Sequence, residues 1–574
     1  MRWPTWFRLR TSARAAVRRL HLRWSCDPHD TGPVAQLDEL ILVFARSAAP
    51  SAGSAEVLFA DDLLDWQTRS EIEHRAGDLL AKLRARVADT ELLEASEYQL
   101  RVEWVNLLLA HAVGAALRDA GPFTELTPSS MTPAAIVAGV ASALGITAPS
   151  TATGPARASG RKAAIRSQIA RLVVTARAAT TSTRKVRVLA FPGLKLGEAL
   201  GELSGAQLAG AGVGVAAVAE LGYGEAAKLV LRHALPAVAL PRGSGGERSA
   251  AGVPLSDLTG SPALDVALAH VARAALDSGA QIASEISAVL PRLERLPALR
   301  AIVVPTAALG ATRALGSWAG RHGIRVASFQ HGIYGMIEGD GGDRRADVLF
   351  GWGPAVAGQV AMWTQPRPRL EVVGVPGLAR AARRAAESSL RRVLVATTNA
   401  PTGNALAPWS IREDYLDALA DGLARLRRAG VEIELRLHPV ESAAEYATMA
   451  ARAGRDPLRL APPGPFAQVA ERADLLIAPF SSVAYEAAAL AIPVAIWIPR
   501  VPAAVRAAHF VPPLAGELPG TFADAAGFDE LIAHALDDPA NGLEAARSLT
   551  RSLEAYVAPL DTSRFASALA RLGA

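Results

Sequence analysis

From residue 186 onward, short apolar runs alternate with longer amphipathic stretches, and this alternation leaves few folds open to the chain. The runs are rich in Val, Ile, Leu and Phe and lie at 186–191, 301–305, 325–330, 347–352, 370–375, 391–398, 431–439, 474–480 and 493–498. Apolar residues at helical spacing fill the intervals at 198–208, 263–290, 310–321, 413–429, 441–453 and 482–491. Strands that alternate with helices in this way form parallel sheets with helices on both faces.

The two sets of strands, separated by a break near 377–390, predict an α/β chain with two Rossmann-like doubly wound domains in tandem and a helical N-terminal extension. The extension is expected to be helical because 70–86 and 96–119 carry apolar residues three and four positions apart. The predicted parts are a basic Arg/Trp-rich segment at 1–28, a helical region at 29–150, a basic linker at 151–180, a first Rossmann-like domain at 181–380 and a second at 381–574. Ligands of such sheets bind beyond the carboxyl ends of the strands, so we expect a site in the cleft between the two domains.

Composition narrows the classes of function. The chain has 574 residues, half of them hydrophobic, and a net charge of +5, a mild bias that does not indicate a nucleic-acid partner. Its single cysteine, Cys26, excludes an internal disulfide and a cysteine zinc site. No signal peptide and no membrane-spanning run is evident, so a cytoplasmic location is expected.

The first 24 residues contain seven Arg and no acidic residue, and they include Trp3, Trp6 and Trp24. A basic segment with aromatic residues suits the headgroup region of an anionic membrane. An ordinary surface helix or tail is the alternative interpretation. On the first interpretation the protein is peripheral on the inner membrane face.

Ser481 and Ser482 lie between the run 474–480 and a helical pattern. Serine is a common helix N-cap, which accounts for one of the two. Two hydroxyls beside the free N–H groups of a helix N-terminus also form an anion site suited to phosphate. Glu486 is four residues further on, one turn along the same helix, where its carboxylate is placed to accept hydrogen bonds from sugar hydroxyls such as those of ribose.

Arg436 and His438 end the run 431–439, and Pro439 stops it. Alternation places these two side chains on one face, at the carboxyl end of a strand, where they are positioned for a diphosphate. A structural histidine at a strand end is the alternative interpretation of His438.

Gln330, His331 and Gly332 leave another strand at its carboxyl end. A histidine with a near-neutral pKa is the usual general base, and it also suits a phosphate oxygen. Gly332 permits close approach of the backbone or a positive φ. A turn histidine is the alternative. A fourth stretch, Thr397-Thr398-Asn399, follows the first strand of the second domain, and its hydroxyls, that of Thr398 above all, are candidates for a phosphate contact.

Taken in order, QHG at 330–332, RLHP at 436–439, SS at 481–482 and EAAALAIPV at 486–494 resemble the GT-B-fold glycosyltransferases of bacterial surface carbohydrate synthesis. The similar families are the polysialyltransferases, the capsule Kdo transferases and the CDP-glycerol glycerophosphotransferases. The resemblance covers roughly 300–500. It implies that His438, Ser481 and Ser482 hold the nucleotide phosphates, that Glu486 binds the ribose, and that His331 is the base that deprotonates an acceptor hydroxyl.

Two departures from the families' pattern stand out. Ala491 occupies the position before x-Pro where this fold usually has Gly. The acidic pair before Gly that polysialyltransferases carry is not evident, although Glu338 and Asp340 follow His331, so a nearby carboxylate is an alternative base.

The expected function is therefore a glycosyltransferase, inverting in stereochemistry, that moves a sugar or related group from a nucleotide-activated donor to a hydroxyl of a surface-glycan or lipid-linked acceptor. The resemblance favours a CMP- or CDP-linked donor, with a uridine donor as an alternative. Neither a metal nor a cofactor is expected, because no cluster of metal ligands is visible in the sequence. The alternatives are a nucleotide-sugar 2-epimerase on the same fold and a non-catalytic binding protein.

Overall fold

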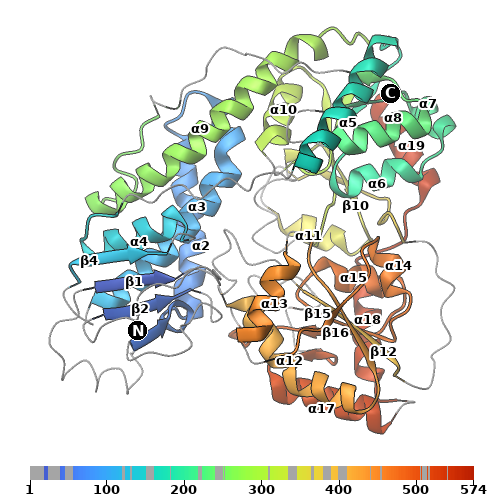
Figure 1. Cartoon of the computed structure of the whole chain (residues 1–574). Helices are drawn as coiled ribbons and strands as arrows, with labels where there is room; N and C mark the ends of the chain where they lie inside the picture. The colour runs from blue at the N-terminus through green and yellow to red at the C-terminus, as the bar shows by residue number, and fades with distance from the viewer. Residues whose placement is uncertain are drawn as a thin grey trace.

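The structure, a computed structural model, describes residues 19–23, 39–44, 56–118, 123–129, 132–149, 161–180, 182–217, 223–238, 250, 253–307, 310–333, 345–363, 367–378, 390–397, 410–439, 441–452, 455–503, 506, 514, 518–538 and 541–574. Within these ranges three parallel sheets form three α/β units, which Figure 1 shows at the left, the upper right and the lower right.

The second Rossmann-like domain contains a six-stranded sheet in the order β14-β13-β12-β15-β16-β17. Every strand pair is parallel, and the first strand, β12, lies between the second and the fourth, which is the doubly wound arrangement. The strands are β12 Arg392–Ala396, β13 Glu432–Arg436, β14 Arg459–Leu460, β15 Leu475–Pro479, β16 Val494–Trp497 and β17 Thr521–Phe522. The helices are α12 Ile411–Arg428, α13 Ala443–Arg452, α14 Phe466–Ala470, α15 Ser482–Ala489, α17 Ala525–Asp537 and α18 Glu544–Glu554.

The first Rossmann-like domain repeats this order on a seven-stranded sheet, β11-β10-β9-β8-β5-β6-β7. Its strands are β5 Val188–Ala190, β6 Val213–Ala216, β7 Ala237–Val238, β8 Ala301–Val304, β9 Arg325–Phe329, β10 Val348–Gly351 and β11 Arg369–Val372. Its helices are α5 Arg161–Thr180, α6 Leu194–Glu202, α7 Gly205–Ala211, α8 Tyr223–His233, α10 Gly310–Arg321 and α11 Val356–Met362. Separate apolar clusters on the two faces of each of these sheets confirm the prediction of two doubly wound domains.

The predicted helical region at 29–150 also contains strands that the sequence did not indicate. The expected helices are present as α2 Trp66–Arg84 and α3 Thr90–Leu117, and α4 Ala134–Leu144 follows them. They pack on a four-stranded parallel sheet in the order β3-β2-β1-β4, made of β1 Arg19–Arg23, β2 Glu39–Val43, β3 Glu56–Phe59 and β4 Glu125–Pro128, with a 3-10 turn at Ala60–Leu63. We call this unit the N-terminal domain.

The four-stranded sheet also changes the interpretation of the basic segment at 1–28. Residues 19–23, which belong to the segment for which membrane contact was one of two interpretations, form the inner strand β1, and Leu20 and Leu22 are fully buried in it. They therefore cannot lie in a lipid headgroup region. Residues 1–18 are outside the described part of the chain.

Two further domain boundaries differ from the prediction. The described part of the expected linker, 161–180, is helix α5, which packs on α8 of the first Rossmann-like domain. At the other end of the chain, helix α19 (Thr562–Gly573) leaves the second domain and packs on β5 and α7 of the first, as Figure 1 shows. Phe565 of α19 contacts Phe329 of β9 and Phe350 of β10, with ring centroids 5.6 and 5.2 Å apart.

A single long helix, α9 (Pro262–Leu293), joins the N-terminal domain to the first Rossmann-like domain. Its first half contributes Leu264 and Leu268 to the core of the N-terminal domain, and its second half contributes Ile286 and Val289 to the first Rossmann-like core. In Figure 1 it runs from the left-hand unit to the upper right. The two units therefore share one structural element.

A buried charge cluster ties the same two units together. Arg313 of α10 pairs with Glu94 of α3 (Nε–Oε2 3.0 Å) and with Glu97 (Nη2–Oε1 2.8 Å). Arg345, which precedes β10, pairs with the same two carboxylates. Burial raises the pKa of Glu97, but the surrounding guanidinium groups, Arg313 foremost, outweigh it and hold that pKa below its usual value.

Helix α3 is long and apolar enough to cross a membrane by length and composition alone, which the sequence analysis did not anticipate. In the structure it is a core helix that packs against α2, α4, α9 and α10.

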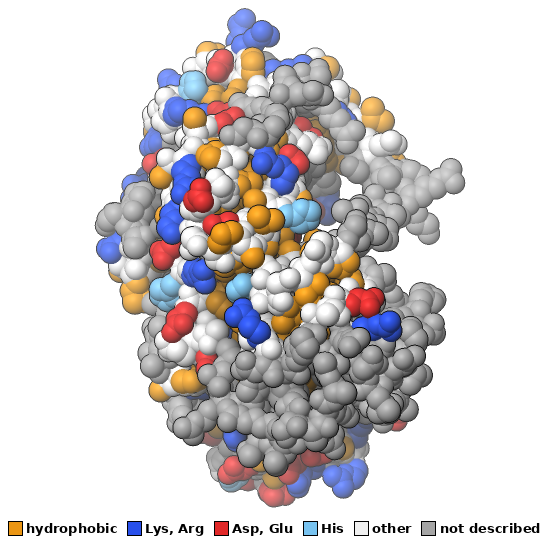
Figure 2. All heavy atoms as spheres, turned by 90° about the vertical axis from the view of Figure 1, so that its left-hand side faces the viewer, with side chains coloured by type: hydrophobic (Ala, Val, Ile, Leu, Met, Phe, Trp, Pro, Cys, Tyr) orange, Lys and Arg blue, Asp and Glu red, His pale blue; other side chains and the backbone are white. Residues whose placement is uncertain are grey.

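Figure 2 views the molecule from the side of the N-terminal domain, and on the described part of this face Lys and Arg side chains are interspersed with Asp and Glu.

Candidate functional site

The carboxyl ends of β13, β12 and β15 lie side by side at one edge of the six-stranded sheet. Strand order reverses between β12 and β15, and such a reversal is where doubly wound sheets bind ligands. Thr397 follows β12. Arg436 is the last residue of β13, and His438 lies two residues beyond it. Ser481 and Ser482 follow β15. The sequence-predicted donor residues are therefore gathered at this edge, apart from Thr398, which lies outside the described residues.

Ser481 occupies the N-cap position of α15 in an extended conformation (φ −152°), yet its side chain makes no capping hydrogen bond. Neither its hydroxyl nor that of Ser482 has a hydrogen-bond partner among the described residues, and both side chains are partly exposed. The capping alternative is thus not realised. The helix N-terminus presents two hydroxyls without a partner among the described residues, together with the N–H groups of its first residues, and this arrangement suits an oxyanion.

The turn at His438-Pro439, which we call the HP turn, follows β13. Its backbone is fixed by the side chains of Thr397 and Glu441, to which the sequence analysis gave no such role. The backbone N–H of His438 lies 2.8 Å from Glu441 Oε2 and 2.9 Å from Thr397 Oγ1, and Thr397 also donates to Glu441. Strand β13 ends at Arg436, two residues earlier than the alternation suggested, because His438 N–H makes these contacts. Burial lowers the pKa of the His438 imidazole, and Glu441 opposes this only in part.

Arg436 is a half-buried cation at this edge of the sheet. One of its nitrogens, Nη2, donates to the carbonyl of Gly464 at 2.9 Å, and its guanidinium carbon lies 5.7 Å from the ring centroid of Phe466. Among the described residues it forms no ion pair. Burial lowers its pKa, whereas the nearby Glu486 raises it. A guanidinium held in this way retains donors for a phosphate.

Glu486 is buried, with 6% of its surface exposed, and it pairs with Lys195 of the first Rossmann-like domain (Nζ–Oε2 3.0 Å). Burial raises the pKa of Glu486, and Lys195 counteracts this only in part, so the net shift is upward. Burial lowers the pKa of Lys195, but Glu486 and Glu198 outweigh it, so the net shift is upward. The two charges therefore stabilise each other across the two domains.

Sequence reasoning missed Lys195 and Glu441. The signal for Lys195 was present, because it follows the first strand of its domain and lies in the first turn of the next helix, the same kind of junction that drew attention to Ser482. Glu441 gave no such signal, because a glutamate after a strand is ordinarily solvated.

The first domain contributes the Gln330–Gly332 turn, which is built on a fully buried glutamine. Gln330 Oε1 accepts from the Trp352 backbone N–H at 2.8 Å, and its Nε2 donates to the Gly332 carbonyl at 2.9 Å. Gly332 does not have a positive φ. A Cβ placed there would lie 3.9 Å from Ser482 Oγ, an ordinary van der Waals distance, so the turn lies next to the N-terminus of α15 but the space there does not require glycine.

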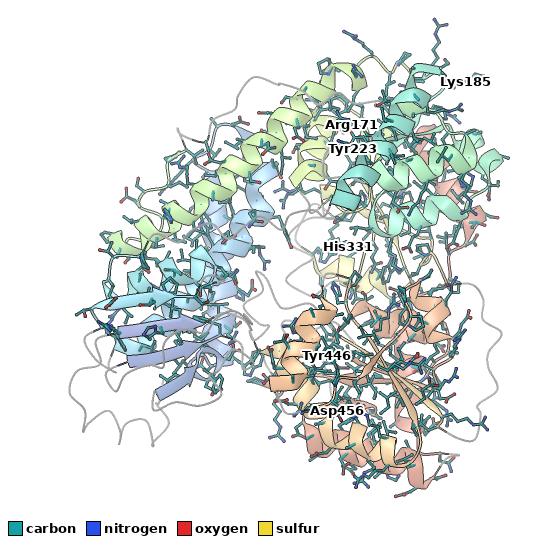
Figure 3. The ribbon with its side chains drawn as sticks, in the orientation of Figure 1. Arg171, Lys185, Tyr223, His331, Tyr446 and Asp456 are labelled. Atoms are coloured by element: carbon teal, nitrogen blue, oxygen red, sulfur yellow. The ribbon has the colours of Figure 1, made fainter. Side chains whose placement is uncertain are left out.

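His331 is therefore adjacent in sequence to a glycine that faces the N-terminus of α15. Its side chain is exposed, and Figure 3 shows it between the two Rossmann-like domains. The structure thus brings together His331, Gly332, Ser481, Ser482, Arg436 and Glu486 from both domains. No group of three or more His, Cys, Asp or Glu side chains suited to a metal is found among the residues that the structure describes.

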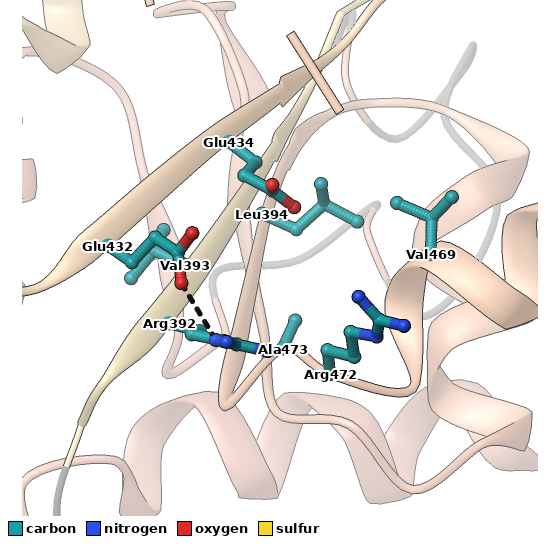
Figure 4. A pocket seen from close by; sticks show the side chains of 8 residues that line it. All are labelled: Arg392, Val393, Leu394, Glu432, Glu434, Val469, Arg472 and Ala473. Atoms are coloured by element: carbon teal, nitrogen blue, oxygen red, sulfur yellow. Dashed lines mark ion pairs between the residues drawn. The ribbon is translucent and has the colours of Figure 1, made fainter. Parts of the chain in front are cut away.

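Figure 4 shows a separate small pocket, lined by Arg392, Val393, Leu394, Glu432, Glu434, Val469, Arg472 and Ala473. Arg392 and Glu432 begin β12 and β13 and pair at 2.8 Å (Nε–Oε2). The pocket thus lies at the amino ends of these strands, opposite the edge where ligands of such sheets bind. It is not part of the candidate site.

No family model and no curated protein matches this chain. Among solved structures, it is similar to the UDP-GlcNAc 2-epimerase of Neisseria meningitidis bound to UDP-GlcNAc, with 12% identity, 67% of this chain and 99% of that chain covered, and a TM-score of 0.39. MurG of Acinetobacter baumannii has 14% identity, with 67% and 99% covered, and a TM-score of 0.37. The wall teichoic acid polymerase TagF has 12% identity, with 48% and 72% covered, and a TM-score of 0.31. At these scores the likenesses carry no argument about the reaction, which has to come from the site.

Proposed function

We propose that this protein is a glycosyltransferase that transfers a sugar or related group from a nucleotide-activated donor to an acceptor hydroxyl. The observation that carries the proposal is the meeting of Gly332 with Ser482, which brings a histidine of one domain to an uncapped helix N-terminus of the other. A donor bound at the six-stranded sheet is thereby adjacent to a candidate base.

In this mechanism the donor phosphates interact with the Ser481 and Ser482 hydroxyls, the α15 N–H groups and Arg436. The His438 side chain, in the turn that follows β13, also contacts the donor phosphates. The acceptor oxygen attacks the anomeric carbon while the bond from that carbon to the phosphate oxygen breaks, and the nucleotide leaves with the electron pair. His331 takes the acceptor proton. Fixed donors and a cation stabilise the charge that develops on the leaving phosphate.

The first test is a thermal-shift panel with CMP, CDP, CTP, UMP, UDP, GDP and ADP. A nucleotide that binds only the folded state raises the unfolding temperature by mass action. We expect one base to be selected and the shift to be lost in His438→Ala. A cytidine nucleotide is the expected ligand, on the resemblance of the motifs alone. No shift with any nucleotide would contradict the proposed donor site and would favour a non-catalytic protein.

A nucleotide-sugar 2-epimerase is the second candidate, because it needs the same phosphate contacts and cleft. Product analysis with the donor alone separates the two: an epimerase converts the donor without an acceptor, whereas a transferase needs an acceptor for transfer. His331→Ala should abolish transfer while nucleotide binding stays nearly intact. Unchanged turnover in that variant would show that His331 is not the base and would favour the alternative, a nearby carboxylate.

We further propose a surface-glycan or lipid-linked acceptor and a cytoplasmic protein that contacts the inner membrane face through residues 1–18, the basic part of the N-terminal segment that precedes β1. The support is compositional, from its arginines and tryptophans. Flotation with anionic vesicles, with and without residues 1–18, tests this. Equal recovery of both forms would remove the membrane proposal and leave the donor site unaffected.

A further inference from the structure

Lys195 lies where the seven-stranded sheet reverses strand order, between β5 and β8, at the edge where this domain would itself bind a ligand. It is in the first turn of α6, where the helix dipole disfavours a positive charge. The residue before it, Leu194, has a φ of 47°, a left-handed conformation that costs a non-glycine residue about 1 kcal/mol or more. The helix dipole therefore does not favour a charged lysine here, and its partner has to compensate.

That partner is Glu486, 291 residues away on the other domain. Lys195 Nζ contacts Glu486 Oε2, and the lysine side chain is 21% exposed while that of Glu486 is 7% exposed. Lys195 also contacts Glu198 one turn along α6, at 3.4 Å. Among the described residues, Lys195 alone hydrogen-bonds the Glu486 carboxylate, so the other oxygen, Oε1, keeps its capacity to accept.

A buried carboxylate without a counter-charge takes up a proton and becomes a hydrogen-bond donor as well as an acceptor. Lys195, 3.0 Å away across the interface, opposes this proton uptake. We propose that Lys195 is a positioning residue of the donor site, which fixes Glu486 as an ionised acceptor for the ribose hydroxyls of the nucleotide. The inference rests on the donor site of the proposed function, in which the resemblance assigns the ribose to Glu486, and it adds a residue of the first domain to that site.

The arrangement makes ribose recognition depend on both domains. The phosphate-binding groups belong to the second domain alone, whereas the state of Glu486 is set by a residue of the first. Loss of Lys195 should therefore weaken binding through the ribose and leave the phosphate contribution in place. A hydroxyl bound to an ionised buried carboxylate makes a strong hydrogen bond, and its loss typically reduces affinity about tenfold.

The test measures dissociation constants for CDP, UDP, ADP and GDP and for their 2′-deoxy forms by calorimetry, with wild type, Lys195→Met and Lys195→Arg. Wild type should prefer the ribonucleotide, Lys195→Met should lose about tenfold in affinity for it and most of that preference, and Lys195→Arg should recover both. Lys228→Met is the matched control, because Lys228 also pairs with a glutamate, Glu225, at 2.6 Å, on an exposed part of α8. It should bind like wild type.

The pH profile supplies a readout that a merely structural lysine would not move. The charged groups that act on Glu486 are Lys195 and Glu198 from α6 and Arg436 from β13. Without Lys195, burial raises the pKa of Glu486 further, so the loss of affinity in Lys195→Met should be largest at pH values between the pKa of Glu486 in wild type and its higher pKa in the variant, and should shrink as pH rises above both. A loss that is the same at every pH would overturn the inference.

The two possible failures are distinguishable. If wild type binds none of the nucleotides, the donor site itself fails and the inference falls with it. If wild type binds but Lys195→Met and wild type have equal affinities and equal ribose preference, the Lys195 inference alone is overturned. Should Lys195→Met fail to fold, Glu486→Gln replaces it, since the amide has the same shape and needs no counter-charge. It should lose the ribose preference, and an unchanged preference in that variant would equally overturn the inference.

Discussion

Trp352 donates to Gln330 twice, from its backbone N–H to Oε1 at 2.8 Å and from its indole Nε1 to the backbone carbonyl at 2.7 Å. Both residues are fully buried at the carboxyl ends of β9 and β10. A turn that the sequence suggested only as a place for a histidine is therefore fixed by the residue before it. The glutamine holds the backbone from which His331 projects.

Replacement of Gln330 by leucine should lower the free energy of unfolding by about 3 kcal/mol, because the Trp352 N–H loses its partner in a buried place and the Gly332 carbonyl loses its partner in a half-buried one. Turnover should fall further than the loss of folded protein accounts for, since the His331 backbone is released. Urea unfolding and assays of the folded fraction measure the two effects. Gln67→Ala, at an exposed helix position where the side chain bonds Glu71, should change stability by less than about 0.5 kcal/mol.

Ala491, which follows the C-cap of α15, has a φ of 57°, a left-handed conformation that favours glycine. Ala491→Gly removes the left-handed strain of a Cβ and should stabilise the fold by about 0.5–1 kcal/mol, after the higher entropy of glycine in the unfolded chain is counted. A higher urea midpoint at unchanged slope is the expected result. Ala424→Gly, on the exposed face of α12, should do the opposite and cost about 1 kcal/mol. Equal effects of the two changes would contradict the strain at Ala491.

Arg313→Met should destabilise the protein by about 3–5 kcal/mol, because it leaves Glu94 and Glu97 without their most buried counter-charge. Calorimetry should show the loss as a lower unfolding temperature of the N-terminal domain, which contacts α10 through this cluster. Arg321→Met is the control, since Arg321 pairs with Glu91 but is 46% exposed, and it should cost less than about 1 kcal/mol. Similar losses in both variants would mean that burial of the cluster is not the cause.

Nucleotide binding should be accompanied by proton uptake through His438. Burial holds the pKa of the free imidazole below its usual value, so it is neutral at pH 7. A phosphate nearby favours the charged form and raises that pKa, so protons are taken up at pH values between the free and bound pKa. Calorimetry in buffers of different ionisation enthalpy measures this. His438→Gln should abolish the uptake, and His534→Gln, on an exposed turn of α17, should leave it unchanged; uptake that persists in His438→Gln would assign the proton to another group.

The sequence predicted the two Rossmann-like domains well because their strands are long apolar runs, as at 301–305, and their helices have clear spacing. It missed β6, whose Val-Gly-Val-Ala is too small and uncharged to stand out, and β7, β14 and β17, which have two residues each and no period to detect. It misread β1 because Arg19 and Arg23 flank Leu20 and Leu22, so a buried strand looked like part of a basic surface segment.

The residues of the candidate site were likewise predictable only where the sequence carries a local signal. Ser481, Ser482, Arg436 and His331 were accessible to prediction, because a strand end followed by a helix is a local signal. Lys195 and its partner were not connected, because nothing local in a chain links residues 291 positions apart. The place of α19 was missed for a similar reason, since an apolar stripe on a helix does not specify which sheet it covers.

Helix α9 has a consequence for how this protein can be divided. Its 32 residues, roughly 48 Å long at 1.5 Å per residue, belong half to one core and half to the next. A chain cut at residue 181 would keep the whole helix and leave Leu264, Leu268 and Val271 in water. The N-terminal unit is therefore not a module that recombination or cloning can add and remove at a linker, and exchange of this unit between proteins would have to carry the first half of α9 with it.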